Sequence, residues 1–432
     1  MIVEIPYGED ILRGEISDEK ILDIIEADDM PVIKNFREKV RKEIADQLSK
    51  FSELGEESKI AIVVTDRTRP TPNHIIVPEL VAELEKYQVK PDNISVISGL
   101  GLHAPDSRED FAENIGDDML EKVNWQNHDC DAKDTVKAGT TSRGVEVLVN
   151  RRYYEADIKI GTGAVAPCMF AGWSGGGKIV LPGITGRKTI EENHVLFVDI
   201  LRNLPRGALF NTLPPQNIVR EDIEEAAKIS SLDFVINTVL NPDNEVSNFA
   251  AGDPVSVHRN LAKYMSEYLE IDCDGKADVL VAGVGSKNYE VSLFQGGSRV
   301  LGATEKAIKE EGTMILVSEC REGVCEEIEE DAQEFEKWLK ELPAPEKILD
   351  ACEDRCLDSA KGCILMVFSW FINELNVDII LVTDNISKEK AEKINMSQAD
   401  ELSEAIKMAE KKHEDEATWR IIPGANYVFP NI

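Results

Sequence analysis

The feature that most constrains the fold is the alternation of short apolar segments with longer amphipathic segments in the first half of the chain. Lys59–Val64 and Asn93–Ser98 have the length and β-branched content of buried strands, while Phe36–Leu54 and Ile75–Lys86 have the spacing of amphipathic helices. Strands that alternate with helices form parallel βα units, because a crossover between parallel strands needs a helix-length connection. We therefore expect an α/β fold with mainly parallel sheets.

The same alternation continues along the chain. Further strands are expected at Val145–Val149, Ile158–Gly161 and Phe234–Asn237, and helices near Thr189–Leu201, Glu221–Ile229 and Val255–Leu269. After a polar stretch near residue 272 a second series is expected, with strands at Val279–Val284, Met314–Val317 and Asp378–Val382 and helices at Val300–Glu310, Glu327–Leu339 and Leu357–Phe371.

The length of 432 residues exceeds what one hydrophobic core usually supports. We expect two α/β domains, residues 1–272 and 273–432, with an active site in the cleft between them. The final stretch Trp419–Pro430 is compatible with a return to either domain, including the N-terminal one.

The charge of the chain argues against several classes of partner. With 81 acidic and 48 basic residues the formal net charge is −33, and no basic patch is evident. Such a surface repels nucleic acid and anionic lipid. The N-terminus lacks a basic leader region, and the longest apolar run, Cys363–Ile372, is about half of a membrane span. The sequence predicts a cytoplasmic protein without nucleic-acid or membrane partners, and it leaves the oligomeric state open.

The eight cysteines do not form a recognisable zinc or disulfide pattern. Two pairs are closely spaced, Cys320 with Cys325 and Cys352 with Cys356, but neither spacing is that of a zinc site. We interpret the cysteines as mostly reduced thiols.

Polar residues follow two of the expected strands, where ligand sites of open α/β sheets lie. After Ile60–Val64 come Asp66, Arg67 and Arg69 in a loop stiffened by prolines, and a guanidinium there suits a carboxylate or phosphate. After Ile94–Ser98 a glycine-containing loop ends at His103, a side chain suited to proton transfer near neutral pH. The alternative for each is a local turn or a surface residue.

The third strand-end segment is the longest and the richest in glycine. It runs from Gly161 through Cys168 and Lys178 to His194 and suggests backbone brought close to a ligand. Gly172, Gly177 and Lys178 match the spacing of a phosphate-binding P-loop. That reading fails because Ile179 stands where a magnesium-binding hydroxyl belongs, and Pro182 interrupts the helix whose N-terminus should hold the phosphates.

Taken together, these motifs resemble the lactate racemase family, the enzymes of the nickel-pincer nucleotide. The residues that carry the resemblance are Asp66, Thr68, Arg69 and Pro70; Gly101, His103 and Pro105; and Ala171, Gly172, Ser174, Gly175, Gly176, Lys178, Pro182 and Gly183, followed by Asn193 and His194. The resemblance covers most of the first 200 residues and continues more faintly around Leu293, Phe294 and Gln295.

The resemblance implies an isomerase, a racemase or epimerase of small 2-hydroxy acids that works by reversible hydride transfer. It implies that Lys178 is covalently attached to pyridinium-3,5-bisthiocarboxylic acid mononucleotide and that His194 completes the coordination of nickel, for which an imidazole is suited. Proteins that make the cofactor and insert nickel are implied as partners, beside the 2-hydroxy acid substrate.

The remaining site residues take their expected roles from the same resemblance. His103 matches one catalytic base, and Asp66 and Arg69 match the first loop, with Arg69 toward the substrate carboxylate. Gln295 matches a residue on the cofactor side, with Phe294 and Ser298 beside it. Ser174, Gly175 and Gly176 are candidates to hold the phosphate of the mononucleotide.

Two positions depart from the family pattern. Cys168 stands where the family has a second histidine base, and a thiol can act as a base only when it is ionised. A base from elsewhere, such as His128, is an alternative. Ser298 stands where the family has a lysine, and Arg299 or Lys287 would have to replace that charge.

These departures make a substrate other than lactate, such as a dicarboxylate or a sugar acid, the expectation. They leave open another redox or lyase reaction on the same cofactor and the binding of an acid without turnover. The third alternative is a P-loop-like nucleotide-binding protein.

Overall fold

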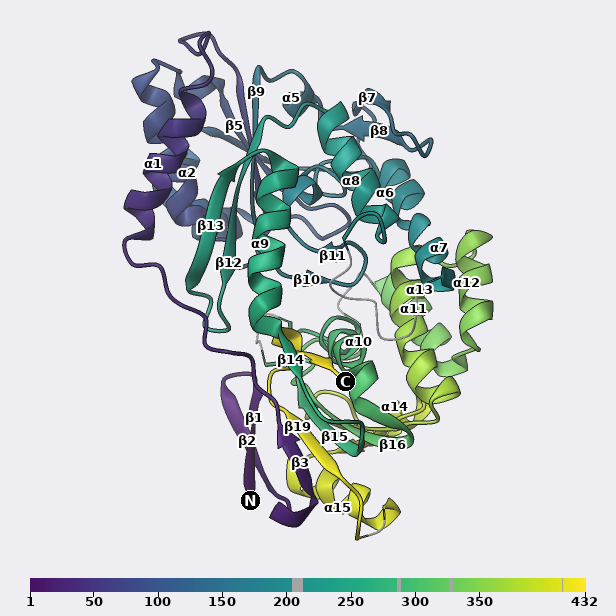
Figure 1. Cartoon of the computed structure of the whole chain (residues 1–432). Helices are drawn as coiled ribbons and strands as arrows, with labels where there is room; N and C mark the ends of the chain where they lie inside the picture. The colour runs from purple at the N-terminus through teal and green to yellow at the C-terminus, as the bar shows by residue number, and fades with distance from the viewer. Residues whose placement is uncertain (204–212, 286–288, 326–328, 414) are drawn as a thin grey trace. The chain divides into compact units, whose positions relative to one another are not determined.

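The computed structural model describes residues 1–203, 213–285, 289–325, 329–413 and 415–432 (Figure 1). It divides into two compact units. The central unit comprises Met30–Leu196 and Thr212–Ser266, and the terminal unit comprises Met1–Asp29, Phe197–Asn211 and Glu267–Ile432. Each unit contains a six-stranded, mainly parallel sheet with helices, which confirms the expected α/β fold class.

The sheet of the central unit has the order β13-β12-β9-β4-β5-β6. Its strands are β4 (Ile60–Thr65), β5 (Ile94–Gly99), β6 (Asn124–Asn127), β9 (Ile158–Ala164), β12 (Phe234–Leu240) and β13 (Val246–Gly252). Only β13 is antiparallel to its neighbour. The strands β4, β9 and β12 are buried along almost their whole length, as expected for a parallel sheet covered on both faces.

The helices of the central unit follow the strands. They are α1 (Phe36–Leu48), α2 (Asn73–Lys86), α3 (Arg108–Ile115), α4 (Asp117–Lys122), α5 (Arg151–Tyr154), α6 (Arg187–His194), α8 (Ile218–Ile229) and most of α9 (Pro254–Leu269). Val40 of α1 and Leu80 of α2 belong to one apolar core with Ile62 and Val64 of β4. The apolar faces predicted for these helices therefore cover the sheet and fix the edge at which β4, β5 and β9 end.

The sheet of the terminal unit has the order β18-β17-β16-β15-β19-β3, and all its strand pairs are parallel. Its strands are β3 (Ile21–Ile24), β15 (Ala277–Gly283), β16 (Ile308–Val317), β17 (Asp378–Val382), β18 (Ser397–Ala399) and β19 (Trp419–Ile422). Its helices include α10 (Ser298–Thr304), α11 (Glu329–Glu341), α12 (Pro345–Glu353), α13 (Ser359–Ser369), α14 (Lys388–Lys393) and α15 (Leu402–Lys412). None of the described helices combines the length and the apolar content that crossing a membrane requires.

The N-terminal segment differs from the expected division of the chain. Here β1 (Ile2–Tyr7) and β2 (Asp10–Glu15) form a hairpin, and β3 pairs with β19 in the terminal unit. Arg420 of β19 is fully buried, and its guanidinium donates to both carboxylate oxygens of Asp23 at 2.6 and 2.7 Å. This ion pair fastens β3 to β19 and so helps to hold the first 29 residues in the terminal unit.

Two further differences concern the second half. The C-terminal strand β20 (Phe429–Asn431) pairs with β14 (Glu270–Asp272), so the end of the chain stays in the terminal unit. The helix expected at Val300–Glu310 ends at Thr304, and Ile308 already begins β16. The charged residues at the start of β16 have the composition of a helix, but they lie at the exposed end of a long strand whose later residues are buried.

Candidate active site

Three loops of the central unit follow the carboxyl ends of the neighbouring parallel strands β4, β5 and β9. The loop after β5 contacts the segment that follows Lys178, because the amide of Gly101 donates to the carbonyl of Gly183 at 3.0 Å. A Cβ at Gly101 would lie 3.3 Å from Pro182, and its φ of +59° is a second reason for glycine. The three motifs that the sequence singled out therefore belong to one region.

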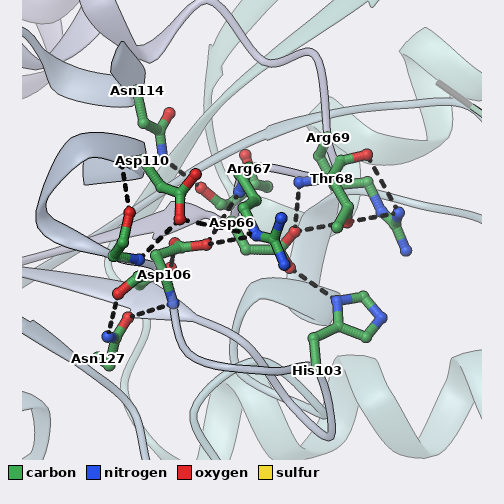
Figure 2. Close-up of polar contacts among 12 residues, drawn as sticks. Asp66, Arg67, Thr68, Arg69, His103, Asp106, Asp110, Asn114 and Asn127 are labelled. Carbon is green, nitrogen blue, oxygen red and sulfur yellow. Dashed lines mark hydrogen bonds and ion pairs between the residues drawn. The ribbon is translucent and has the colours of Figure 1, made fainter. Parts of the chain in front are cut away.

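Asp66 and His103 form a hydrogen-bonded pair in this region (Figure 2). Oδ2 of Asp66 lies 2.9 Å from Nδ1 of His103. Asp66 is buried, whereas the side chain of His103 is about two-fifths exposed (39%). Burial alone would raise the pKa of the Asp66 carboxyl, but His103, Arg69 and Thr68 together hold it well below its ordinary value. The ionised carboxylate favours a proton on Nδ1 and leaves Nε2 as the acceptor.

The other oxygen of Asp66 organises the loop after β4. Oδ1 accepts hydrogen bonds from the amide and the hydroxyl of Thr68, and the hydroxyl oxygen of Thr68 accepts from Nη1 of Arg69 at 2.9 Å. Figure 2 shows this chain of contacts from His103 through Asp66 and Thr68 to Arg69. One buried carboxylate therefore orients both the histidine and the arginine that the sequence proposed for the site.

The second arginine of this loop has a different setting. Nε of Arg67 lies 3.8 Å from carboxylate oxygens of both Asp106 and Asp110. Asp106 also accepts from the hydroxyl of Ser98 at 2.7 Å, and its backbone carbonyl accepts from Asn127 at 2.8 Å. Burial, with a smaller contribution from the charge of Asp66, raises the pKa of the Asp106 carboxyl. Arg67 thus belongs to the network that fixes the loops.

Cys168 and Lys178 are brought together by a short hairpin. Cys168 ends β10 (Pro167–Cys168), which pairs with β11 (Gly172–Trp173), and Nζ of Lys178 lies 3.4 Å from Sγ of Cys168. Both side chains are partly buried. Burial, together with the charges of Arg220 and Arg69, lowers the pKa of the Lys178 amine, and Cys168 opposes this effect. The amine is therefore shifted toward its neutral, nucleophilic form.

The glycines before Lys178 are close to protein atoms. A Cβ at Gly175 would lie 2.9 Å from Val165, one at Gly176 would lie 2.8 Å from His258, and one at Gly177 would lie 2.9 Å from Ala227. The sequence suggested that these glycines allow a ligand to approach the backbone. In the structure each of them allows close packing inside the protein.

Ser174 and Gly176 also have protein partners for their polar groups. The Ser174 hydroxyl donates to the carbonyl of Ala164 at 2.7 Å and accepts from the amide of Ala166, and the Gly176 amide donates to Asn237 at 2.7 Å. Lys178 lies in a single turn of 3-10 helix, Gly176–Ile179, and the next helix begins only at Arg187. A P-loop needs a helix directly after its lysine, so that alternative is not supported.

His194 is the last residue of α6 and lies against the Cys168 hairpin. Its ring stacks on Phe170, with the ring centroids 5.1 Å apart and 25° between the planes. The neighbouring Asn193 donates to Asp222 of α8 at 2.9 Å. The structure thus brings the two ends of the segment from Cys168 to His194 together.

Most of the chain matches two known family models. Residues 7–203 match the family model described as the lactate racemase N-terminal domain, and residues 274–429 match the lactate racemase C-terminal domain. The chain belongs to the lactate racemase family. The enzyme class is therefore that of an isomerase, a racemase, as the sequence predicted.

Individual members of the family are similar to this chain over almost its whole length. The lactate racemases of Thermoanaerobacterium thermosaccharolyticum and Lactiplantibacillus plantarum are each 28% identical over 434 residues, covering 98% of this chain and 97% of theirs. The structure of the lactate racemase apoprotein from the former matches with a TM-score of 0.84 at 25% identity and full coverage of both chains. A protein from Thermotoga maritima matches with a TM-score of 0.69 at 19% identity, covering 91% of this chain and 98% of its own, and shows the fold alone.

The other expected site residues lie in the terminal unit. The hydroxyl of Ser298 is buried and donates to the carbonyl of Phe294 at 2.6 Å, within the helical turn that they share. Phe294 packs edge-on against Phe335, and the amide of Gln295 donates to Ser292. Arg299, a candidate replacement for the missing lysine charge, stacks over the ring of Tyr289 at 4.0 Å, and Lys287 lies outside the described residues.

Two residues of the central unit change the list of candidates. His128 is buried, with Nε2 3.0 Å from the carbonyl of Thr185 and Nδ1 3.3 Å from the amide nitrogen of Asn150, and burial lowers its pKa. These contacts give it a structural setting. Arg220 of α8 was not recognised from the sequence, although it is fully buried beside the hairpin. Nothing in the pattern of a helix indicates that a guanidinium will bind backbone carbonyls.

Proposed function

We propose that this racemase interconverts the stereoisomers of a small 2-hydroxy acid other than lactate, by reversible transfer of hydride from C2, with a nickel-pincer nucleotide attached to Lys178. The observation that carries the proposal is the contact between Asp66 and His103, which supplies an oriented base in the region that also contains Lys178. The family supports the racemase activity on hydroxy acids, and the residues of this chain support the finer statements.

The residues present fit a covalently attached, metal-bearing cofactor. The lowered pKa of the Lys178 amine favours formation of the covalent bond, and the imidazole of His194 is a ligand that nickel accepts. Because Ser174 and Gly176 have protein partners, we assign to them the shaping of the loop. We assign to Gly175 the binding of the phosphate of the mononucleotide.

When bound, the nickel-pincer nucleotide supplies an acceptor and donor for hydride. The chain supplies the acid–base chemistry. Nε2 of His103 takes the proton of the substrate hydroxyl, and Asp66 holds the imidazole in the tautomer that can accept it. The guanidinium of Arg69, oriented through Thr68, binds the substrate carboxylate with two parallel hydrogen bonds.

The second face of the substrate needs a second group that handles protons. We assign this role to Cys168, whose sulfur lies 3.4 Å from the Lys178 amine. The thiolate is the form of Cys168 that can accept a proton. The engaged ring nitrogens of His128 argue against that alternative.

The substrate assignment follows from the terminal unit. Ser298 replaces a family lysine and turns its hydroxyl back onto the helix, so this position offers no cation to a substrate or cofactor. The loss of one positive charge changes which acids are bound best. We therefore propose a substrate larger than lactate, such as a dicarboxylate or a sugar acid.

Mass spectrometry tests the cofactor assignment. The chain is coexpressed with the proteins that make the cofactor and insert nickel, and the peptide containing Lys178 is weighed while nickel is measured in the intact protein. We expect an added nucleotide on that peptide and about one nickel per chain. Lys178→Arg is the matched control, because it keeps the charge but cannot form the bond. An unmodified Lys178 peptide in a nickel-free protein would refute the assignment.

A second candidate is a different redox or lyase reaction on the same cofactor. The replacement of the second histidine by Cys168 favours it, because a one-sided reaction needs only one base. Formation of both stereoisomers from either pure isomer would exclude this candidate.

A further inference from the structure

Two side chains at the start of α8 donate hydrogen bonds to backbone carbonyls of the loop between Cys168 and Lys178. Arg220 donates from Nε to the carbonyl of Ala171 at 3.2 Å, from Nη1 to that of Gly175 at 3.2 Å, and from Nη2 to that of Trp173. Asn217 adds a bond from Nδ2 to the carbonyl of Phe170 at 3.1 Å. Four carbonyls of one short loop are therefore held by two side chains three residues apart on the same turn.

The same turn holds the helix that ends at His194. Asn193 donates to the carboxylate of Asp222 at 2.9 Å and contacts the carbonyl of Val219 at 3.4 Å. The position of Gly177 against Ile223 and Ala227 adds close packing further along α8. One helix thus sets the relative positions of Cys168, Lys178 and His194.

Arg220 is an unusual residue for a purely structural role. Its side chain is fully buried, and among the described residues no carboxylate forms an ion pair with it. Burial lowers the pKa of the guanidinium to about 10, and the charges of Cys168 and Glu224 act in the opposite direction. Burying a charged side chain costs free energy that a neutral side chain would avoid, so a positive charge at this position indicates an electrostatic role.

We propose that Arg220 is a positioning residue that fixes the loop from Cys168 to Lys178 and provides the counter-charge for an ionised Cys168. The three carbonyl contacts account for the shape of the guanidinium fork. Cys168 pairs with Gly172, which lies between the two residues, Ala171 and Trp173, whose carbonyls Arg220 binds, so the same contacts hold the cation beside the strand that carries the thiol. Attachment of a thiocarboxylic acid to Lys178, with loss of water, would turn the amine into a neutral thioamide, and Arg220 would then remain as a buried cation beside the thiol.

Other charged and titratable groups face Arg220 and must be controlled. Glu224 lies on the same helix, and Arg259 and His258 lie on α9. Arg259 forms an ion pair with Glu224 at 2.6 Å and is partly exposed, so Arg259→Gln is a matched loss of one nearby positive charge. Lys178→Met separates the contribution of the amine.

The experiment measures the alkylation of Cys168 by iodoacetamide in the unloaded chain, followed on its own peptide between pH 5.5 and 9.5. Loss of the charge in Arg220→Gln should slow the reaction at pH 7 about tenfold, which corresponds to one unit in the inflection of the pH profile. Arg220→Lys should keep the inflection near that of the wild type but speed the hydrogen exchange of residues 171–177, because the single ammonium nitrogen of lysine cannot reach the carbonyls that three separate nitrogens of the guanidinium bind. If Arg220→Gln does not fold, the hydrogen exchange of residues 171–177 in Arg220→Lys still tests whether Arg220 positions the loop.

An unchanged profile in Arg220→Gln, or a shift no larger than that in Arg259→Gln, would overturn the proposal. So would unchanged hydrogen exchange of the loop in Arg220→Lys. The inference deepens the proposed function, since it gives Cys168 its ionised form. The measurement needs no cofactor, so a missing attachment at Lys178 would refute the proposed function while leaving this result intact.

Discussion

Asp66 Oδ2 lies 2.9 Å from His103 Nδ1, and the same carboxylate binds Thr68 through its other oxygen. A single buried group therefore orients the imidazole and, through Thr68, the guanidinium of Arg69. An amide at position 66 could keep part of this geometry, but it would lack the charge that favours a proton on Nδ1.

Substitution Asp66→Asn should lower kcat on the order of 10²- to 10⁴-fold, because the base would be held in the wrong tautomer. The pKa of Asp66 is held below its ordinary value of 3.8, so the carboxylate stays ionised above that pH and should add no acidic limb to the rate profile there. Steady-state kinetics with the best substrate of a 2-hydroxy acid screen measure both effects. Asp117→Asn, an exposed aspartate of the same unit, is the control, and equal losses in the two variants would contradict the assigned role.

Substitution Lys178→Met should make the unloaded chain more stable at neutral pH. The pKa of the folded-state amine lies below its ordinary value of 10.5, so folding disfavours the bound proton. The unfolded chain then binds more protons than the folded chain, and the wild type gains stability relative to the variant as the pH rises toward 10.5. Urea unfolding between pH 7 and pH 10 measures this difference, with Lys228→Met as an exposed control on α8. A constant difference across this range would be inconsistent with the lowered pKa.

Substitution Cys168→Ser should abolish racemisation in both directions, because the equilibrium between enantiomers fixes the ratio of the two rates. The half-reaction that uses His103 should survive, so one enantiomer should still yield 2-keto acid in a single turnover. Acid quenching of the loaded enzyme and quantification of the 2-keto acid test this. Equal loss of 2-keto acid from both enantiomers would show that Cys168 is not specific to one face. Cys168→His restores the histidine of the family pattern and should recover turnover.

Substitution Asp23→Asn should destabilise the terminal unit by about 1.5–3 kcal/mol, the usual worth of hydrogen bonds to a charged group. Asp23 accepts two bonds from the fully buried Arg420 and is partly exposed itself, which keeps the expected value in this range. Denaturant unfolding followed by limited proteolysis should show the first 29 residues released earliest. Glu15→Gln, an exposed residue on β2, is the control, and a loss of less than 0.5 kcal/mol in Asp23→Asn would contradict the role of the pair.

The sequence predicted where along the fold the candidate site residues lie, but not which of their side chains contact one another. Parallel strands end at one edge of a sheet, so Asp66, His103 and Lys178 could be placed near one another from strand patterns alone. Which of these side chains pair could not be predicted, because the Asp66–His103 contact depends on how two loops fold after their strands end.

The parts that were missed depend on distant partners. The alternating residues of β1 carry a strand signal, but the place of the N-terminal segment is fixed by Arg420, almost 400 residues away. The role of Arg220 has no local signal, since its acceptors are backbone carbonyls that any residue offers. The close packing of protein atoms around the glycines near Lys178 could not be predicted, because an approach of the backbone to protein and an approach to a ligand need the same residue type.

The most direct test is a screen of enantiopure 2-hydroxy acids carrying deuterium at C2, with cofactor-loaded protein in ordinary water. The proposed mechanism predicts that at least one acid larger than lactate is converted to its opposite stereoisomer and that the product keeps the deuterium, because hydride returns to the carbon it left. Inversion with loss of deuterium to solvent would indicate proton abstraction and would contradict hydride transfer. The absence of interconversion for every acid, lactate included, would contradict the racemase itself.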